Sequence, residues 1–101
     1  MAAMALPGNL VGRIGDFRAH LAQHTAHEPT LAVIKEYLDE IVDQVVGPSV
    51  AGPAIQMGLI ALKITGIQNI INGIDGVPED AKDALRQEAD LIKDSASILL
   101  N

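Results

Sequence analysis

The sequence contains no cysteine and no tryptophan, and its only aromatic residues are Phe17 and Tyr37. Disulfides, thiol nucleophiles and cysteine-ligated metals are therefore excluded. A stacking site for a nucleobase or a flat cofactor is disfavoured, because such sites usually depend on aromatic rings. Since 49% of the residues are hydrophobic, the core must consist mainly of aliphatic side chains, which suits the packing of helix on helix.

Positive charge is also scarce, with 7 basic residues against 13 acidic ones and a net charge of −6. There is no basic arm or stripe to neutralise phosphates, so we expect no nucleic-acid partner and no anionic membrane surface. The first residues, MAAMALPGN, lack the basic and apolar regions of a secretory signal. A cytoplasmic location is the expectation that follows.

The 101 residues are enough for a single domain, residues 1–101, and four helical segments can be read along them. Asn9 is a suitable N-cap for the first segment, Pro29 interrupts the chain before the second, and Thr30 can cap that second segment. GPSVAGP at 47–53 reads as a loop with Pro53 opening the third helix, and Pro78 opens the fourth. The sequence thus predicts an all-α fold, most simply a small antiparallel four-helix bundle. Its helices are expected at about 9–26, 30–46, 53–73 and 78–100.

The third segment is apolar around nearly its whole circumference, and Lys63 is the only charged residue between positions 44 and 74. The other three segments can cover only part of such a helix, so we expect its remaining surface to contact a helix of another chain. A row of small residues within it would allow a second backbone to approach closely. The residues expected to take part in association are Ala54, Gly58, Ala61, Ile60, Ile64, Ile67 and Ile71, with Leu38 and Ile41 from the apolar seam of the second segment.

The same segment is long enough to span a membrane. Gln56, Lys63 and Gln68 lie within it, however, and a lysine near the middle of a bilayer costs about 2.5–3.5 kcal/mol. No flanking basic residues or aromatic belt accompany it. A membrane-active protein that inserts this helix is therefore kept as an alternative, and a membrane is not the expected partner.

All three histidines fall within eight residues of the first helix and its end. On a helical wheel His20, His24 and His27 share one face, and imidazoles at this spacing suit Zn²⁺ or Ni²⁺, with Asp16 as a hydrogen-bond acceptor behind His20. An alternative to a metal site is that these histidines only stabilise the end of the helix, because protonated histidines near a helix C-terminus interact favourably with its dipole. A small metal-binding or pH-sensing protein is thus the other alternative.

Catalytic motifs are absent from the sequence. Glu36, Asp39, Glu40 and Asp43 lie opposite the apolar seam of the second helix, which indicates a solvated acidic face. No serine stands in a nucleophile context, and no glycine-rich phosphate loop follows a strand. We therefore expect no enzyme and no required cofactor. The leading hypothesis is a non-enzymatic helical interaction or assembly protein that forms homo-oligomers, most simply dimers, or binds another helical protein.

Overall fold

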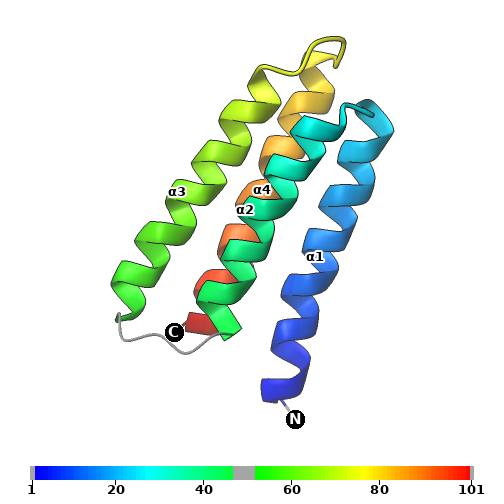
Figure 1. Ribbon diagram of the computed structural model, residues 1–101. Helices are drawn as coiled ribbons and strands as arrows, with labels where there is room; N and C mark the ends of the chain where they lie inside the picture. Colours follow the sequence, from blue (N-terminus) through cyan, green and yellow to red (C-terminus); the bar gives the residue numbers. More distant parts are fainter. Residues whose placement is uncertain (1, 47–51, 101) are drawn as a thin grey trace.

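The computed structural model describes residues 2–46 and 52–100, and for residues 2–8 it describes the backbone. These residues form four α-helices and, within the described ranges, no β-strand (Figure 1). The helices are α1 (Ala2–His24), α2 (Glu28–Val46), α3 (Pro53–Asn72) and α4 (Glu79–Leu100). The predicted all-α fold is confirmed.

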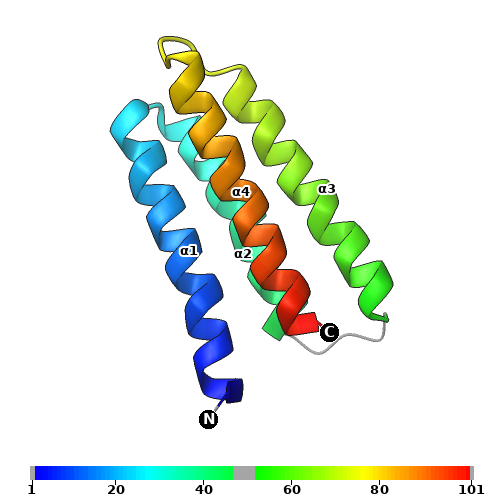
Figure 2. The ribbon, with the colours of Figure 1, turned by 180° about the vertical axis from the view of Figure 1, so that it is seen from behind.

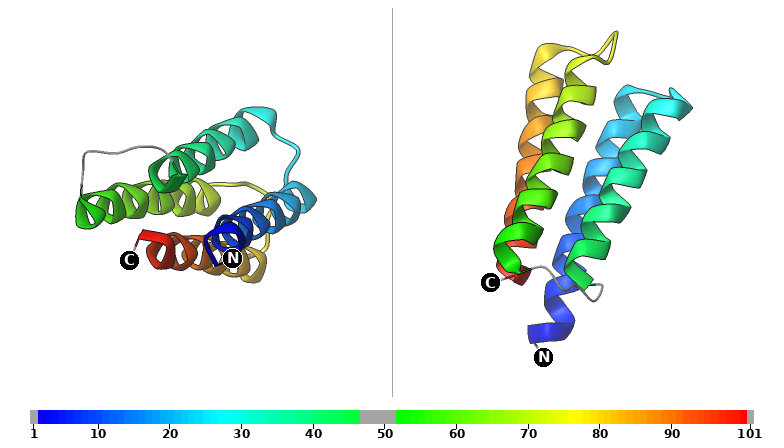
Figure 3. Two further views of the ribbon diagram at one scale, coloured as in Figure 1. Left: turned by 90° about the horizontal axis from the view of Figure 1, so that it is seen from below. Right: turned by 60° about the vertical axis from the view of Figure 1, so that its left-hand side comes forward.

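Each helix runs antiparallel to the next, so that the two ends of the chain lie at the same end of the bundle (Figure 1). Figure 2 shows α4 between α1 and α3, and within the described residues α1 and α3 make no contact. The most extensive contacts are those of α3 with α4 and of α1 with α4. Seen from the side, α1 lies beside α2 and α3 beside α4 (Figure 3). The chain is therefore an antiparallel four-helix bundle with α1 and α3 on one diagonal.

The first helix begins earlier and ends earlier than predicted. It starts at Ala2, so Asn9 is not its N-cap and the chain stays helical through Pro7. Pro7 is the sixth residue of this helix, beyond its first turn, where a proline removes one backbone hydrogen bond and its ring crowds the carbonyl one turn earlier. At the other end the last helical residue is His24 rather than Ala26, although the Thr25 N–H still donates to the Leu21 carbonyl at 3.1 Å.

The second helix begins at Glu28, two residues before the predicted cap at Thr30. Pro29 is its second residue and fits there, because backbone N–H groups in the first turn of a helix have no acceptor within the helix, so the missing N–H of proline costs no hydrogen bond. The helix ends at Val46 as expected. Most of the predicted loop at 47–53 lies outside the described residues, while Pro53 opens α3 after the N-cap Gly52, as predicted.

The connection from α3 to α4 is a tight turn. The N–H of Gly73 donates to the Ile70 carbonyl at 3.1 Å and that of Ile74 to the Ile71 carbonyl at 3.2 Å, which closes the last turn of α3. Gly76 then has a φ of +79°, a left-handed conformation that glycine adopts without steric cost. Pro78 precedes the fourth helix, and its carbonyl accepts the Lys82 N–H at 3.0 Å.

The core is almost entirely aliphatic, with Phe17 as its one fully buried aromatic ring among the described residues. Three residues of the α2 seam are buried at the predicted heptad positions, Ile34, Leu38 and Ile41. Burial of each large apolar side chain stabilises the fold by about 1.5–3 kcal/mol relative to exposure. The core residues are Leu10, Ile14, Phe17, Leu21, Ile34, Leu38, Ile41, Ile60, Ile64, Ile67, Ile71, Leu85, Ala89, Ile92 and Ala96.

Candidate functional site

The isoleucine stripe of α3 lies inside the bundle and not on its surface. Six of the nine residues expected to mediate association have at most 1% of their surface exposed. They pack against the other helices of the same chain and cannot contact a second molecule while the bundle is folded. This part of the prediction needs correction, because these side chains form the core of the single chain. The six are Ile60, Ile64, Ile67, Ile71, Leu38 and Ile41.

Three polar side chains of α3 hold this helix to its neighbours. Gln56 is buried, and its amide donates to the Gln44 carbonyl near the end of α2 at 2.8 Å. Lys63 forms an ion pair with Glu40 of α2 at 2.5 Å. On the opposite side, the Gln68 amide donates to the Arg86 carbonyl and to Asp90 of α4, both at 3.0 Å. Gln56, Lys63 and Gln68, the residues that disfavour a membrane span, therefore form contacts with the neighbouring helices.

Lys63 and Tyr37 form a small cluster between α2 and α3. The lysine ammonium lies 5.4 Å from the centre of the Tyr37 ring, within range of a cation–π interaction. The hydrogen bond that Lys63 donates to Glu40 is the largest effect on the pKa of Lys63 and raises it. Burial is the next largest effect and lowers this pKa, and the charges of Glu40, Tyr37 and Glu36 raise it further. The ring also lies against Gly66, where an added Cβ would come within 3.1 Å of a ring carbon. Glycine at this position therefore allows the ring to approach α3 closely.

The outward face of α3 carries a patch of exposed apolar residues in its first half. Ile55, Leu59 and Leu62 follow one another at i, i+4 and i+7, and they are 61%, 39% and 69% exposed. Ala54 and Gly58 lie beside them and are exposed, and a Cβ added at Gly58 would meet no atom within 4 Å. We call these five residues the α3 patch. Of the predicted association residues, Ala54 and Gly58 thus lie on an open surface, and Ala61 is half-buried at its edge.

By length and composition alone, α3 is the one described helix apolar enough to cross a membrane. Its mean hydropathy over the best window is 1.3, and only 28% of that window is buried in the bundle. The central helices of soluble proteins meet the same criterion, so this observation is weak evidence for a membrane span. The low buried fraction shows that the other three helices leave much of this apolar helix uncovered.

The three histidines do not share one helical face, so that prediction is wrong. His27 lies in the connection after α1, where its Nδ1 is 2.8 Å from the Thr30 hydroxyl. His20 Nδ1 lies 2.6 Å from Glu88 of α4, a partner that sequence spacing could not reveal because it is 68 residues away. Asp16, expected behind His20, lines the same small hollow as this pair. Within the described residues, no three histidine or carboxylate side chains gather closely enough to hold a metal ion.

The acidic residues of α2 divide between solvent and ion pairs. Asp39 pairs with Lys35 one turn earlier at 2.7 Å, and both side chains are more than half exposed. Glu40 is partly covered and pairs with Lys63. The ion pair of Glu40 with Lys63 joins α2 to α3. The sequence indicated that Glu40 belongs to a solvated acidic face. In the structure this face is not wholly solvated, because Glu40 is partly covered and paired.

Comparison of the chain with models of protein families finds no match, and comparisons with curated proteins and with solved structures find none either.

Proposed function

We propose that this chain is a non-enzymatic helical assembly protein that associates with a second copy of itself through the α3 patch. The observation that carries the proposal is the apolar row of Ile55, Leu59 and Leu62 on the outward side of a helix whose opposite side is already buried. Contiguous apolar surface of this kind usually marks an association site. A two-fold dimer is the simplest assembly, since it buries the same patch on both subunits.

The α3 patch is well shaped for a second helix. Ala54 and Gly58 have little or no side chain, so a partner helix could approach the backbone closely beside the larger apolar row. The part of α3 that follows is more polar on this side, with Thr65 and Asn69 exposed. An apolar contact bordered by polar groups resembles the core and rim of known interfaces.

The expected affinity is moderate. The exposed fractions of Ile55, Leu59 and Leu62 together amount to between one and two whole side chains. At about 1.5–3 kcal/mol per side chain, a two-fold contact would gain about 5–10 kcal/mol. Association costs an estimated ~4–15 kcal/mol in lost freedom and ordering, so we expect a dimer that dissociates on dilution.

Light scattering coupled to size-exclusion chromatography, from 10 to 200 μM protein, tests the proposal. Concentration should be read by refractive index, because one tyrosine and no tryptophan give little ultraviolet absorption. The unaltered chain should shift from about 10.6 kDa toward twice that mass as its concentration rises. Ile55→Glu should remain monomeric over the same range, because association would bury its carboxylate against apolar atoms.

Ile98→Glu is the matched control. Ile98 lies on α4, outside the α3 patch, and is 61% exposed, the same fraction as Ile55. This variant changes the net charge equally and should dimerise like the unaltered chain. A clean monomer of the unaltered chain at 200 μM would refute self-association, and so would equal loss of the dimer in both variants.

A further inference from the structure

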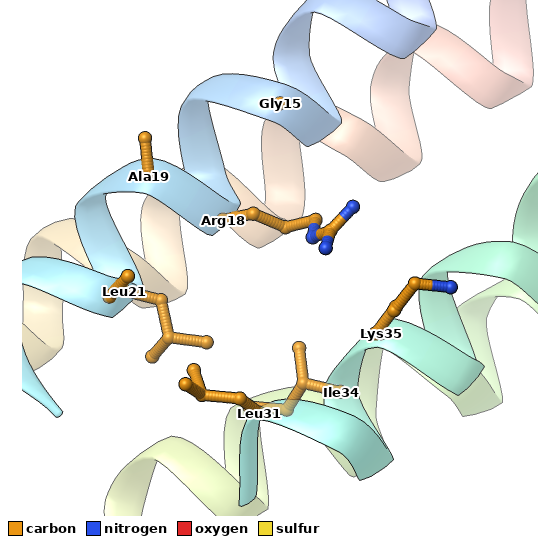
Figure 4. Close-up of a pocket in the computed structure, with 8 residues that line it drawn as sticks. Gly15, Arg18, Ala19, Leu21, Leu31, Ile34 and Lys35 are labelled. Atoms are coloured by element: carbon orange, nitrogen blue, oxygen red, sulfur yellow. The ribbon is translucent and has the colours of Figure 1, made fainter. Parts of the chain in front are cut away.

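A hollow of about 310 Å³ lies between α1 and α2, and no residue of the α3 patch lines it (Figure 4). Of the four neighbouring helix pairs, α1 and α2 contact each other least, which leaves this space between them. Leu21 and Ile34 lie at its base but are each only 1% exposed, so its open apolar surface comes from the half-buried Leu31 and from small residues of α1. The wall on the side of α1 is made of small residues, Gly15, Ala19 and Ala22.

Two cationic side chains line the same hollow, one from each helix. Figure 4 shows Arg18 of α1 and Lys35 of α2 at one end of the hollow and the leucines toward the other. Arg18 makes no ion pair with any described residue. Lys35 pairs with Asp39, but both side chains are more than half exposed, and such surface pairs contribute little. A chain with 13 acidic residues against 7 basic ones thus places two cations beside an apolar hollow, with one of them unpaired.

From this arrangement we infer that the hollow binds a small aliphatic carboxylate, the chemistry of a short fatty acid. The planar fork of Arg18 matches the two oxygens of a carboxylate, and Lys35 adds a second positive charge across the hollow. The aliphatic tail would lie against Leu31, Ala19 and Ala22, where it displaces water from apolar surface. The volume is near the lower limit of ligand pockets, which favours a small molecule. No aromatic ring lines the hollow, so nothing there selects a flat ligand.

Isothermal titration calorimetry of the full chain with butanoate, hexanoate, octanoate and decanoate measures the contribution of the tail. Each buried methylene should tighten binding about fourfold until the tail fills the hollow, after which the affinity should level off. Octan-1-ol, a neutral probe of similar length, should bind at least about tenfold more weakly than octanoate, because it lacks the charge-assisted hydrogen bonds. No heat of binding with millimolar octanoate would overturn the inference.

Charge variants test the head of the ligand. Arg18→Gln and Lys35→Gln should each weaken octanoate binding, the arginine variant by about tenfold or more, and should leave octan-1-ol binding unchanged. Equal affinity of the unaltered chain for the acid and the alcohol would overturn the assignment of these cations.

Two glycine variants test the location. A Cβ added at Gly15 or at Gly12 meets no atom within 4 Å, so a side chain can start at either position without a clash. Gly15→Leu should abolish octanoate binding by filling the hollow, whereas Gly12→Leu, with the same change on the same helix, should bind as the unaltered chain does. Equal binding by both variants would place the ligand elsewhere and overturn the site. Circular dichroism of each variant verifies that the helices are intact, and the monomeric Ile55→Glu variant should bind octanoate normally, because the two surfaces are separate.

Discussion

Replacing Ile64 and Leu62 by alanine, one at a time, tests which side of α3 faces the core. The two residues are two positions apart on the helix and point in nearly opposite directions, about 200° from one another. Ile64 is 1% exposed and Leu62 is 69% exposed. Ile64→Ala leaves a cavity in a packed core and should lower the free energy of unfolding by about 2–5 kcal/mol. Leu62→Ala removes atoms that are mostly in solvent, and the single chain should change by no more than about 0.5 kcal/mol.

Urea unfolding followed by circular dichroism at 222 nm, at 10 μM and at 200 μM protein, separates the two effects. At a slope of about 1.5 kcal/mol per molar urea, Ile64→Ala should lower the midpoint by about 1–3 M at 10 μM, where the chain is mostly monomeric. The unaltered chain should have a higher midpoint at 200 μM than at 10 μM, because association stabilises the folded form. Leu62→Ala should reduce that difference while leaving the midpoint at 10 μM nearly unchanged.

One outcome would refute this reasoning directly. If Leu62→Ala cost several kcal/mol and Ile64→Ala almost nothing at 10 μM, α3 would be rotated by about half a turn from the orientation described, and the α3 patch would be part of the core. If the unaltered chain showed the same midpoint at both concentrations, the orientation would stand and self-association would fail.

Two further predictions concern the cluster between α2 and α3. Because Glu40 raises the pKa of Lys63 above 10.5, the ion pair is fully present below that pH and is lost as the pH rises through the raised pKa. The free energy of unfolding should therefore fall above about pH 10.5, and it should fall less in Lys63→Met, as urea unfolding across pH 9–12 will measure. The second prediction concerns Gly66. Gly12→Ala should raise the free energy of unfolding by about 1 kcal/mol through helix propensity. Gly66→Ala should raise it by less, because the added methyl group meets the Tyr37 ring. Equal gains in the two alanine variants, measured by thermal unfolding, would show that the ring moves aside freely.

Much of the fold follows from local signals in the sequence. The number of helices is set by the prolines and glycines that separate them, and Pro53 marks the start of α3. The buried residues of α2 could be predicted because apolar side chains recur on one side of that helix and charged ones on the other. The start of α1 could not, since a Pro-Gly pair resembles a helix boundary even where the chain remains helical.

The tertiary structure decided what the periodicity of α3 could not. A helix that is apolar on nearly every side has no polar side to show which direction is outward, so the isoleucine stripe and the α3 patch were equivalent as sequence. In the structure the isoleucine stripe is buried and the α3 patch is exposed. Lys63 contacts α2 and Gln68 contacts α4, and these two contacts orient the stripe between the neighbouring helices. His20 likewise found its partner on a distant helix. The sequence by itself determined that α3 has more apolar surface than one bundle can cover, and only the packing of the four helices determined which residues remain outside.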